Sequence, residues 1–261
     1  MPVLSKIESE FQEKGFIPCI DVLTSEEVRN LRTNFNDLEE KIGKDNATYS
    51  LHNIHLENKW VLDTASHPNV LKPVTDILGP NVILLDSRFI CKYPCHVENT
   101  EEVQHFVAWH QDVRYWGIDG DVVTAWIAVD DADVENGCMI VIPGTHKQGL
   151  VEHITSIEDG NLLSSNQSIP RHLVDVTKST PCPLSAGQAS LHHGFLIHGS
   201  EPNRSPRRRC GYVVRYVSTS AKPIEDPDRP RSFPSTVLLC GTDTFHNFKD
   251  NRPDWYKPNE M

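Results

Sequence analysis

The stretch from Gln188 to Ser218 reads QASLHHGFLIHGSEPNRSPRRRCGYVVRYVS and decides the fold class of this 261-residue chain. It contains three short runs rich in β-branched and aromatic residues, which polar or proline-rich turns separate. Similar runs precede it at residues 82–93, 121–131, 138–144 and 171–177. Strands at this spacing indicate a β-sandwich or a barrel rather than alternating β and α units.

Two helices are expected before these strands. Thr24 and Glu27 have the spacing of a capping box, and apolar residues then repeat with a helical period until Gly43. A second helix is expected from Pro68 to Ile77, because proline suits the first turn of a helix. We therefore expect one domain over residues 1–261, with helical supports in 1–80, a β-barrel core in about 81–220, and a C-terminal arm or lid in 221–261.

The composition restricts the class of partner. A formal net charge of −11 disfavours nucleic acid and acidic membranes, and no apolar run approaches the ~18 residues of a membrane span. The first residues, MPVLSKIESEFQEKG, carry charges where a signal peptide has its apolar stretch, and the seven cysteines contain no C-x-x-C pair. We expect a cytoplasmic protein with reduced cysteines that acts on a small molecule. The sequence leaves the oligomeric state open.

The tripeptide from His110 to Asp112 and the distant His198 form a candidate metal site. Alternate side chains of an extended strand share a face, so His110 and Asp112 are expected to point the same way. A strand through residues 195–198 is expected to bring His198 from the opposite side of a barrel. Two imidazoles and one carboxylate on one face leave three iron positions open, as in Fe(II) oxygenases. Alone, a His-x-Asp tripeptide is more often a surface turn or a core hydrogen bond.

Arg209 supplies the context that favours the metal site. It stands eleven positions after His198, at the head of the next β-rich run. A dicarboxylate such as 2-oxoglutarate chelates iron through its keto-acid end, and its far carboxylate then needs a planar bidentate cation. Arg209 suits that role, whereas Arg207 and Arg208 suit a solvated basic turn.

Three segments resemble the phytanoyl-CoA dioxygenase family of Fe(II)/2-oxoglutarate oxygenases. They are WHQD at 109–112, DDADVENGCMIVIPGTHK at 130–147 and LHHGFLIHGSEPNRSPRRR at 191–209. The resemblance covers residues 8–220 and implies a mainly β fold with flanking helices, built as a double-stranded β-helix (a jelly-roll or cupin-like barrel). It also implies that His110, Asp112 and His198 bind the iron.

The resemblance further implies how the cosubstrate is held. Arg209 would bind the far carboxylate of 2-oxoglutarate, Ser200 would add a hydroxyl to it, and Trp126 would line the pocket. One more contact is expected from residues 51–55, where His52 and Asn53 are the candidates.

Asp112 also bears on the reaction type. Relatives that chlorinate replace this carboxylate by a small residue, so a retained Asp112 favours hydroxylation. The implied reaction uses Fe(II), 2-oxoglutarate and O2, and it releases succinate and carbon dioxide.

Residues around the first two ligands are candidate substrate contacts. They are Gln104, His105, Arg88, Arg114, Tyr115 and Trp116. The two arginines suit an anionic group, and the aromatic rings suit an ammonium or an apolar body. The strand expected at VRYWG (113–117) is nearer to the small-molecule branch of the family, and the chain ends in Asn-Glu-Met rather than a peroxisomal signal. The expected substrate is a small polar metabolite: an amino acid, an aminophosphonate or a natural-product intermediate.

Three alternatives stay open. One is an acyl-CoA hydroxylase of the same family. Another is a non-catalytic barrel that binds or senses a ligand, although an intact triad with Arg209 argues against it. The third is a cupin-like isomerase or hydrolase with a different divalent metal, against which Arg209 and the 130–147 hairpin argue.

Overall fold

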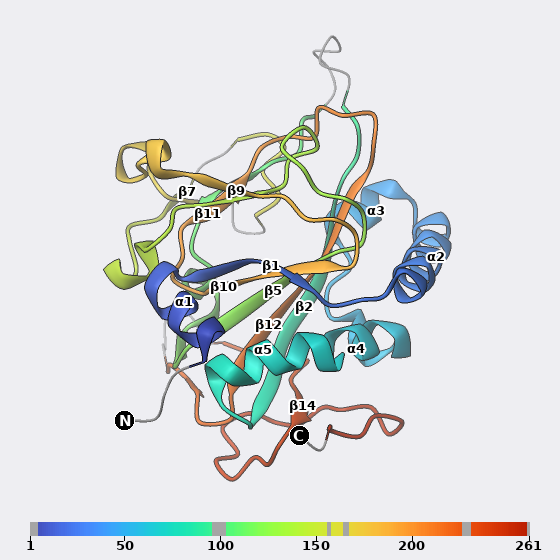
Figure 1. Ribbon diagram of the computed structural model, residues 1–261, viewed down its shortest axis with the longest axis vertical. Coiled ribbons are helices and arrows are strands. Elements are labelled where there is room, and N and C mark those ends of the chain that lie inside the picture. Colours follow the sequence, from blue (N-terminus) through green and yellow to red (C-terminus); the bar gives the residue numbers. More distant parts are fainter. Residues whose placement is uncertain (1–4, 96–102, 156–157, 164–166, 226–230, 260–261) are drawn as a thin grey trace.

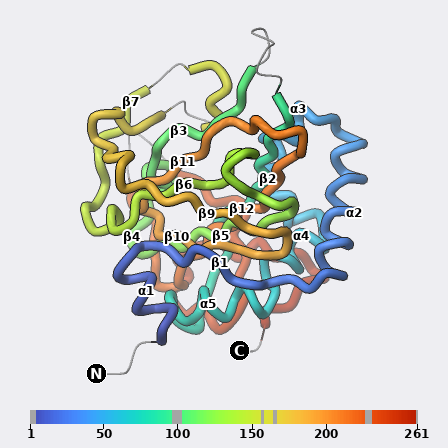
Figure 2. Tube along the Cα trace, turned by 45° about the horizontal axis from the view of Figure 1, so that its top comes forward, coloured from blue at the N-terminus to red at the C-terminus, as the bar shows by residue number. Residues whose placement is uncertain are grey.

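Two antiparallel sheets face each other in the computed structural model, which describes residues 5–95, 103–155, 158–163, 167–225 and 231–259. The larger sheet consists, in order, of β1 (Phe16–Asp21), β10 (Gln188–His193), β5 (Val122–Ala128), β12 (Arg209–Ser218), β2 (Val82–Lys92) and β14 (Val237–Cys240). The smaller sheet consists of β3 (Val107–His110), β11 (His198–Ser200), β6 (Met139–Val141) and β9 (Thr180–Cys182). Figure 2 shows the smaller sheet lying over the larger one. Short pairs join β13 (Lys222–Pro223) to β4 (Ile118–Asp119) and β7 (Ile154–Thr155) to β8 (Gln167–Ser168).

Helices cover the outer face of the larger sheet. They are α1 (Lys6–Lys14), α2 (Ser25–Ile42), α3 (Lys44–Tyr49), α4 (Lys59–Ala65) and α5 (Pro68–Leu78), and Figure 1 shows α4 and α5 running along the sheet. The capping box at the start of α2 is present, since Thr24 Oγ1 accepts from the Glu27 amide and the Glu27 carboxylate accepts from Thr24 N. Both helices expected from the sequence are confirmed.

Strand β12 separates the core from the space between the sheets. Its alternate residues Cys210, Tyr212, Val214 and Tyr216 pack in the main hydrophobic core with the helices. The odd-numbered residues of the strand include Arg209, Val213 and Arg215, which line a cavity on the other face. This period-2 alternation is the normal consequence of strand geometry. One strand therefore supplies both the core and the floor of a polar pocket.

Two expected strands are wrong. Residues 171–177 form the 3₁₀ turns η3 (Arg171–Leu173) and η4 (Val176–Lys178). In η4, Asp175 accepts a hydrogen bond from the Thr177 amide, and such local bonds compete with strand pairing. The segment expected as a strand at 113–117 holds the short helix α6 (Val113–Trp116). Strand β11 begins at His198, so residues 195–197 precede the strand.

The C-terminal residues include part of the larger sheet. Strand β14 pairs with β2, and Tyr256 is buried in the main core. The described part of the segment 221–261 thus includes a strand of the larger sheet and a residue of the main core. No helix among the described residues is long and apolar enough to cross a membrane.

Candidate metal centre and cosubstrate pocket

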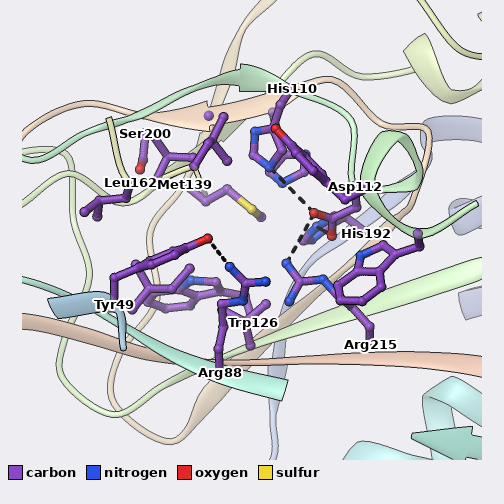
Figure 3. A pocket seen from close by; sticks show the side chains of 18 of the residues that line it. Tyr49, Arg88, His110, Asp112, Trp126, Met139, Leu162, His192, Ser200 and Arg215 are labelled. Atoms are coloured by element: carbon purple, nitrogen blue, oxygen red, sulfur yellow. Dashed lines mark hydrogen bonds and ion pairs between the residues drawn. The ribbon is translucent and has the colours of Figure 1, made fainter. Parts of the chain in front are cut away.

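A cavity of about 270 Å3 lies between the two sheets. The larger sheet contributes Arg88, Ile90, Trp126, Arg209, Val213 and Arg215 to its lining. The smaller sheet contributes Val107, His110, Met139, His198, Gly199 and Ser200. Figure 3 shows His110 and Asp112 on one wall, with Tyr49 and Arg88 on the facing wall. Polar side chains from segments far apart in sequence thus meet in one cavity.

His110, Asp112 and His198 converge in this cavity. Their candidate ligand atoms lie within 4.8 Å of one another, and all three residues are buried. His198 pairs directly with His110 across the neighbouring strands β11 and β3, and the ring centroids are 4.1 Å apart. The expectation that His198 comes from the opposite side of a barrel is therefore wrong. Direct cross-strand pairing brings the two imidazoles together instead.

A turn, rather than strand alternation, brings Asp112 to the two histidines. Strand β3 ends at His110, and Asp112 has helical dihedrals (φ −60°, ψ −40°) as the N-cap residue of α6. The buried Gln111 fixes this turn, since its Nε2 donates to the carbonyls of Gly149 at 2.8 Å and Phe195 at 2.7 Å. The expectation that His110 and Asp112 share a strand face is therefore wrong, although their side chains do meet.

Backbone carbonyls orient the rings of His110 and His198. The Nδ1 of His110 lies 2.9 Å from the carbonyl of Ala108, and the Nδ1 of His198 lies 3.0 Å from the carbonyl of Leu196. Because a carbonyl only accepts, each Nδ1 carries a proton, so the neutral form of each ring has its lone pair on Nε2. Burial holds the pKa of His198 well below its ordinary value. Both rings are thus oriented as metal ligands before any metal binds.

Asp112 is held as a carboxylate. Thr124 Oγ1 donates to its Oδ2 at 2.7 Å, and Arg215 Nη2 lies 3.3 Å from its Oδ1. Burial opposes ionisation, but Arg215 and the neighbouring histidines outweigh it and hold the pKa of Asp112 well below its ordinary value. Arg215 also pairs with Asp86 at 3.1 Å. Two imidazoles and one buried carboxylate form a donor set that fits Fe(II).

His192 also reaches this centre, although it was not among the candidate site residues. It is buried, with its Nε2 3.5 Å from Asp112 Oδ2 and its ring centroid 4.4 Å from that of His198. Neither ring nitrogen has a hydrogen-bond partner among the described residues. Strand β10 carries His192 opposite Thr124, which explains why both side chains approach Asp112.

Arg209 is a buried cation in the same cavity. Only 2% of it is exposed, and its Nη2 donates to the carbonyl of Gly137 at 3.0 Å. Its guanidinium lies 5.3 Å from the centre of the Trp126 ring. No carboxylate pairs with it among the described residues, and burial lowers its pKa to about 10. A buried cation without an anionic partner is unfavourable, so this end of the cavity fits the carboxylate of a ligand.

Lys92 lies beside Arg209 and was missed in the sequence. It is fully buried, and its Nζ donates to Ser200 Oγ at 2.6 Å and to the carbonyl of Glu201. Burial, and then the charge of Arg209, lower the pKa of Lys92 well below its ordinary value. Because Ser200 accepts from Lys92, its own hydroxyl proton is free for a ligand. Strand alternation predicts that Lys92 shares a face with Arg88 and Ile90, but its place beside Arg209 depends on the pairing of β2 with β12.

The other candidates divide into two groups. Arg88, Tyr115, Trp116, Trp126 and Ser200 line the cavity. The lining does not include His52, Asn53, Gln104, His105 or Arg114 among the described residues.

Local structure explains the positions of two residues in the second group. Asn53 uses its Oδ1 to accept from the Ser87 amide, while Tyr49, on the preceding helix α3, reaches the cavity. Arg114 lies in α6, where residues two apart do not share a face, so it points away from the side of Asp112 into a separate cleft with Phe195.

A model of the phytanoyl-CoA dioxygenase (PhyH) family matches residues 11–211. The chain belongs to this family. A probable alpha-ketoglutarate-dependent hypophosphite dioxygenase of Stutzerimonas stutzeri is 25% identical over 236 residues, which cover 83% of this chain and 79% of that relative. The peroxisomal phytanoyl-CoA dioxygenase of Rattus norvegicus is 24% identical over 244 residues, which cover 85% and 71%.

A solved structure extends the likeness to the fold. The apo form of the non-heme monooxygenase ThoJ superposes with a TM-score of 0.76 at 25% identity, covering 95% of this chain and 89% of that one. Family membership and these likenesses indicate an Fe(II)/2-oxoglutarate-dependent oxygenase. The family, the jelly-roll fold class, the enzyme class and the cofactors expected from the sequence are thereby confirmed.

Gly211 leaves space for the indole ring of Trp126. A Cβ at Gly211, on β12, would collide with the indole of Trp126. We expect Gly211→Ala to destabilise the protein by about 1–3 kcal/mol through overpacking and to weaken 2-oxoglutarate binding by moving Trp126. Urea denaturation and a 2-oxoglutarate titration measure the two effects. In a Trp126→Leu background the penalty of Gly211→Ala should shrink, and an unchanged penalty would contradict the steric explanation.

Proposed function

We propose that the chain is an Fe(II)/2-oxoglutarate-dependent hydroxylase of a small polar metabolite, such as an amino acid, an aminophosphonate or a natural-product intermediate. One observation carries the proposal. Three buried ligand atoms within 4.8 Å of one another share a cavity with Arg209, which has no carboxylate partner among the described residues.

The roles follow from the chemistry of each side chain. His110, Asp112 and His198 would hold the iron, which needs neutral imidazoles and an ionised carboxylate. When bound, iron and 2-oxoglutarate supply the oxidation of a substrate C–H bond by O2, with release of succinate and carbon dioxide.

The far carboxylate of 2-oxoglutarate would lie against the guanidinium of Arg209 and the hydroxyl of Ser200. Lys92 supports this arrangement by donating to Ser200 Oγ at 2.6 Å, which directs the hydroxyl proton elsewhere. Trp126 would pack beside the chain of the cosubstrate and exclude water from it. The enclosing sheets keep the reacting groups away from bulk solvent.

The cavity favours a compact substrate. Its volume of about 270 Å3 lies below the ~300–1,000 Å3 of typical ligand pockets, and the cosubstrate takes part of that space. An extended acyl chain fits such a space poorly, which argues against the acyl-CoA alternative. The two relatives also differ in the size of the compound for which they are named, which is hypophosphite for one and phytanoyl-CoA for the other.

The test has two stages. Anaerobic addition of Fe(II) and 2-oxoglutarate should produce the weak visible charge-transfer band of a chelated keto acid. A succinate-release screen across amines, amino acids, phosphonates and acyl thioesters should then give turnover with one of the small polar classes. Acyl thioesters that outperform every small compound would overturn the substrate class.

Absence of the band would count against the oxygenase itself. If the protein gives no band but binds zinc or manganese through other ligands, the cupin-like alternative with a different metal is favoured. A ligand-dependent change in structure with no succinate release for any compound would favour the non-catalytic binding barrel.

A further inference from the structure

Arg88 is a buried cation that the metal centre and the cosubstrate site do not use. It lies on β2, and 11% of its side chain is exposed to solvent. Its Nη1 donates to the hydroxyl of Tyr49, and its guanidinium lies 5.0 Å from the centre of the Tyr49 ring. The Nε of Arg88 has no hydrogen-bond partner among the described residues. Figure 3 shows this pair on the wall that faces His110 and Asp112.

The charge of Arg88 is incompletely neutralised. Its carboxylate partner is Asp86, whose Oδ2 lies 3.9 Å from Nη2 of Arg88. The same oxygen lies 3.1 Å from Nη1 of Arg215, and Arg215 also pairs with Asp112. Two guanidinium groups therefore share Asp86, and Asp112 would in addition serve the iron. Burial and the nearby Arg215 both lower the pKa of Arg88, as expected for a cation short of anions.

Counting the charges of the loaded site leaves a positive excess. Fe(II) and the guanidinium groups of Arg88, Arg209 and Arg215 carry five positive charges. Asp86, Asp112 and the 2-oxoglutarate dianion carry four negative charges. Burial lowers the pKa of Lys92, which is left out of this count; a charged Lys92 would only enlarge the excess. A buried excess of positive charge is unfavourable unless a further anion enters.

We infer that the substrate is a compact anion, a carboxylate or a phosphorus oxyanion, whose charged group binds Arg88 beside Tyr49 on the wall opposite the metal ligands. This inference rests on the proposed function and narrows its substrate class. A planar guanidinium binds either oxyanion in a bidentate manner. With the charged end held on this wall, the remainder of a small molecule extends toward the iron, with Tyr115 and Trp116 among the lining residues.

The experiment measures binding without turnover. The protein is loaded with Mn(II) and saturating 2-oxoglutarate, and isothermal titration calorimetry then compares methylphosphonate and acetate with trimethylammonium and glycerol. We expect the two anions to bind more tightly than the cationic and neutral probes. Loss of the charge-assisted hydrogen bonds in Arg88→Gln should weaken anion binding by about 10- to 100-fold. Tyr49→Phe should weaken it less, and Arg171→Gln, an exposed arginine outside the cavity, should leave it unchanged.

A parallel 2-oxoglutarate titration separates this inference from the proposed function. Each variant should bind 2-oxoglutarate as the wild type does, which also shows that it is folded. If wild-type protein binds 2-oxoglutarate but prefers neutral or cationic probes, the anion inference fails while the oxygenase stands. If Arg88→Gln weakens 2-oxoglutarate binding instead, Arg88 belongs to the cosubstrate site and the inference is overturned. If the wild type binds no 2-oxoglutarate, the proposed function itself fails.

Discussion

Asp112→Ala is expected to reduce iron-dependent succinate release by more than about 100-fold, and to weaken Fe(II) binding in parallel. The substitution removes the only carboxylate of the candidate metal group and leaves two imidazoles. Changes to residues that merely support a metal ligand typically cost about 10- to 100-fold, so loss of a ligand should exceed that range. Succinate release and an anaerobic Fe(II) titration measure the two effects.

Two further variants separate ligand loss from structural damage. Asp112→Ala leaves Arg215 with Asp86 as its remaining ion-pair partner, so part of its effect is on stability. His110→Ala leaves the ion pair between Arg215 and Asp112 intact and should reduce succinate release as much as Asp112→Ala does. Thr124→Val removes only the hydroxyl that donates to Asp112 at 2.7 Å. It should therefore reduce succinate release by about 10- to 100-fold. Full turnover in either ligand variant would place the metal elsewhere.

Arg209→Gln is expected to raise the 2-oxoglutarate concentration needed for half-maximal activity by at least about 30-fold. Truncating one partner of a buried charge pair typically costs about 2–5 kcal/mol, and Arg209 has no other carboxylate among the described residues to share the charge. Metal binding should be nearly unchanged, because Arg209 is not among the metal ligands. A titration of 2-oxoglutarate at fixed Fe(II) measures cosubstrate binding, and a separate titration of Fe(II) measures metal binding.

Arg208→Gln is the matched control for this prediction. Arg208 is the neighbour of Arg209 but pairs with Asp130 at 2.8 Å and Glu39 at 3.0 Å, outside the cavity. Its loss should alter stability without altering the 2-oxoglutarate requirement. Equal effects of the two substitutions would mean that the basic cluster acts as a whole, and the specific role of Arg209 would be lost.

Local signals made part of the fold predictable. Helix α2 has a capping box and a regular apolar stripe, and both are properties of neighbouring residues. Strand β1 has no such local signal. Pro18 interrupts the alternation of its residues, and its pairing with β10 shifts between Ile17 and Ile20. Proline is tolerated there because β1 lies at the edge of the sheet. Such edge strands depend on a neighbour that the sequence does not identify.

The site was predictable to the extent that chemistry is tied to residue type. Histidine, aspartate and arginine at suggestive spacings pointed to His110, Asp112, His198 and Arg209, which share one cavity. Partners that meet only through pairing between strands were not accessible in this way. Lys92 stands opposite Arg209 only because β2 and β12 pair in that register.

Arg215 bears on whether the protein stays folded when no metal is bound. In metalloproteins whose ligands repel one another or lack partners, binding of the ion supplies the free energy of folding, and chelation unfolds the chain. Here Arg215 and Thr124 satisfy Asp112, and backbone carbonyls satisfy both imidazoles, all within the polypeptide. We therefore expect folding not to depend on the metal. A molecule that loses its iron should stay folded and should be able to bind iron again.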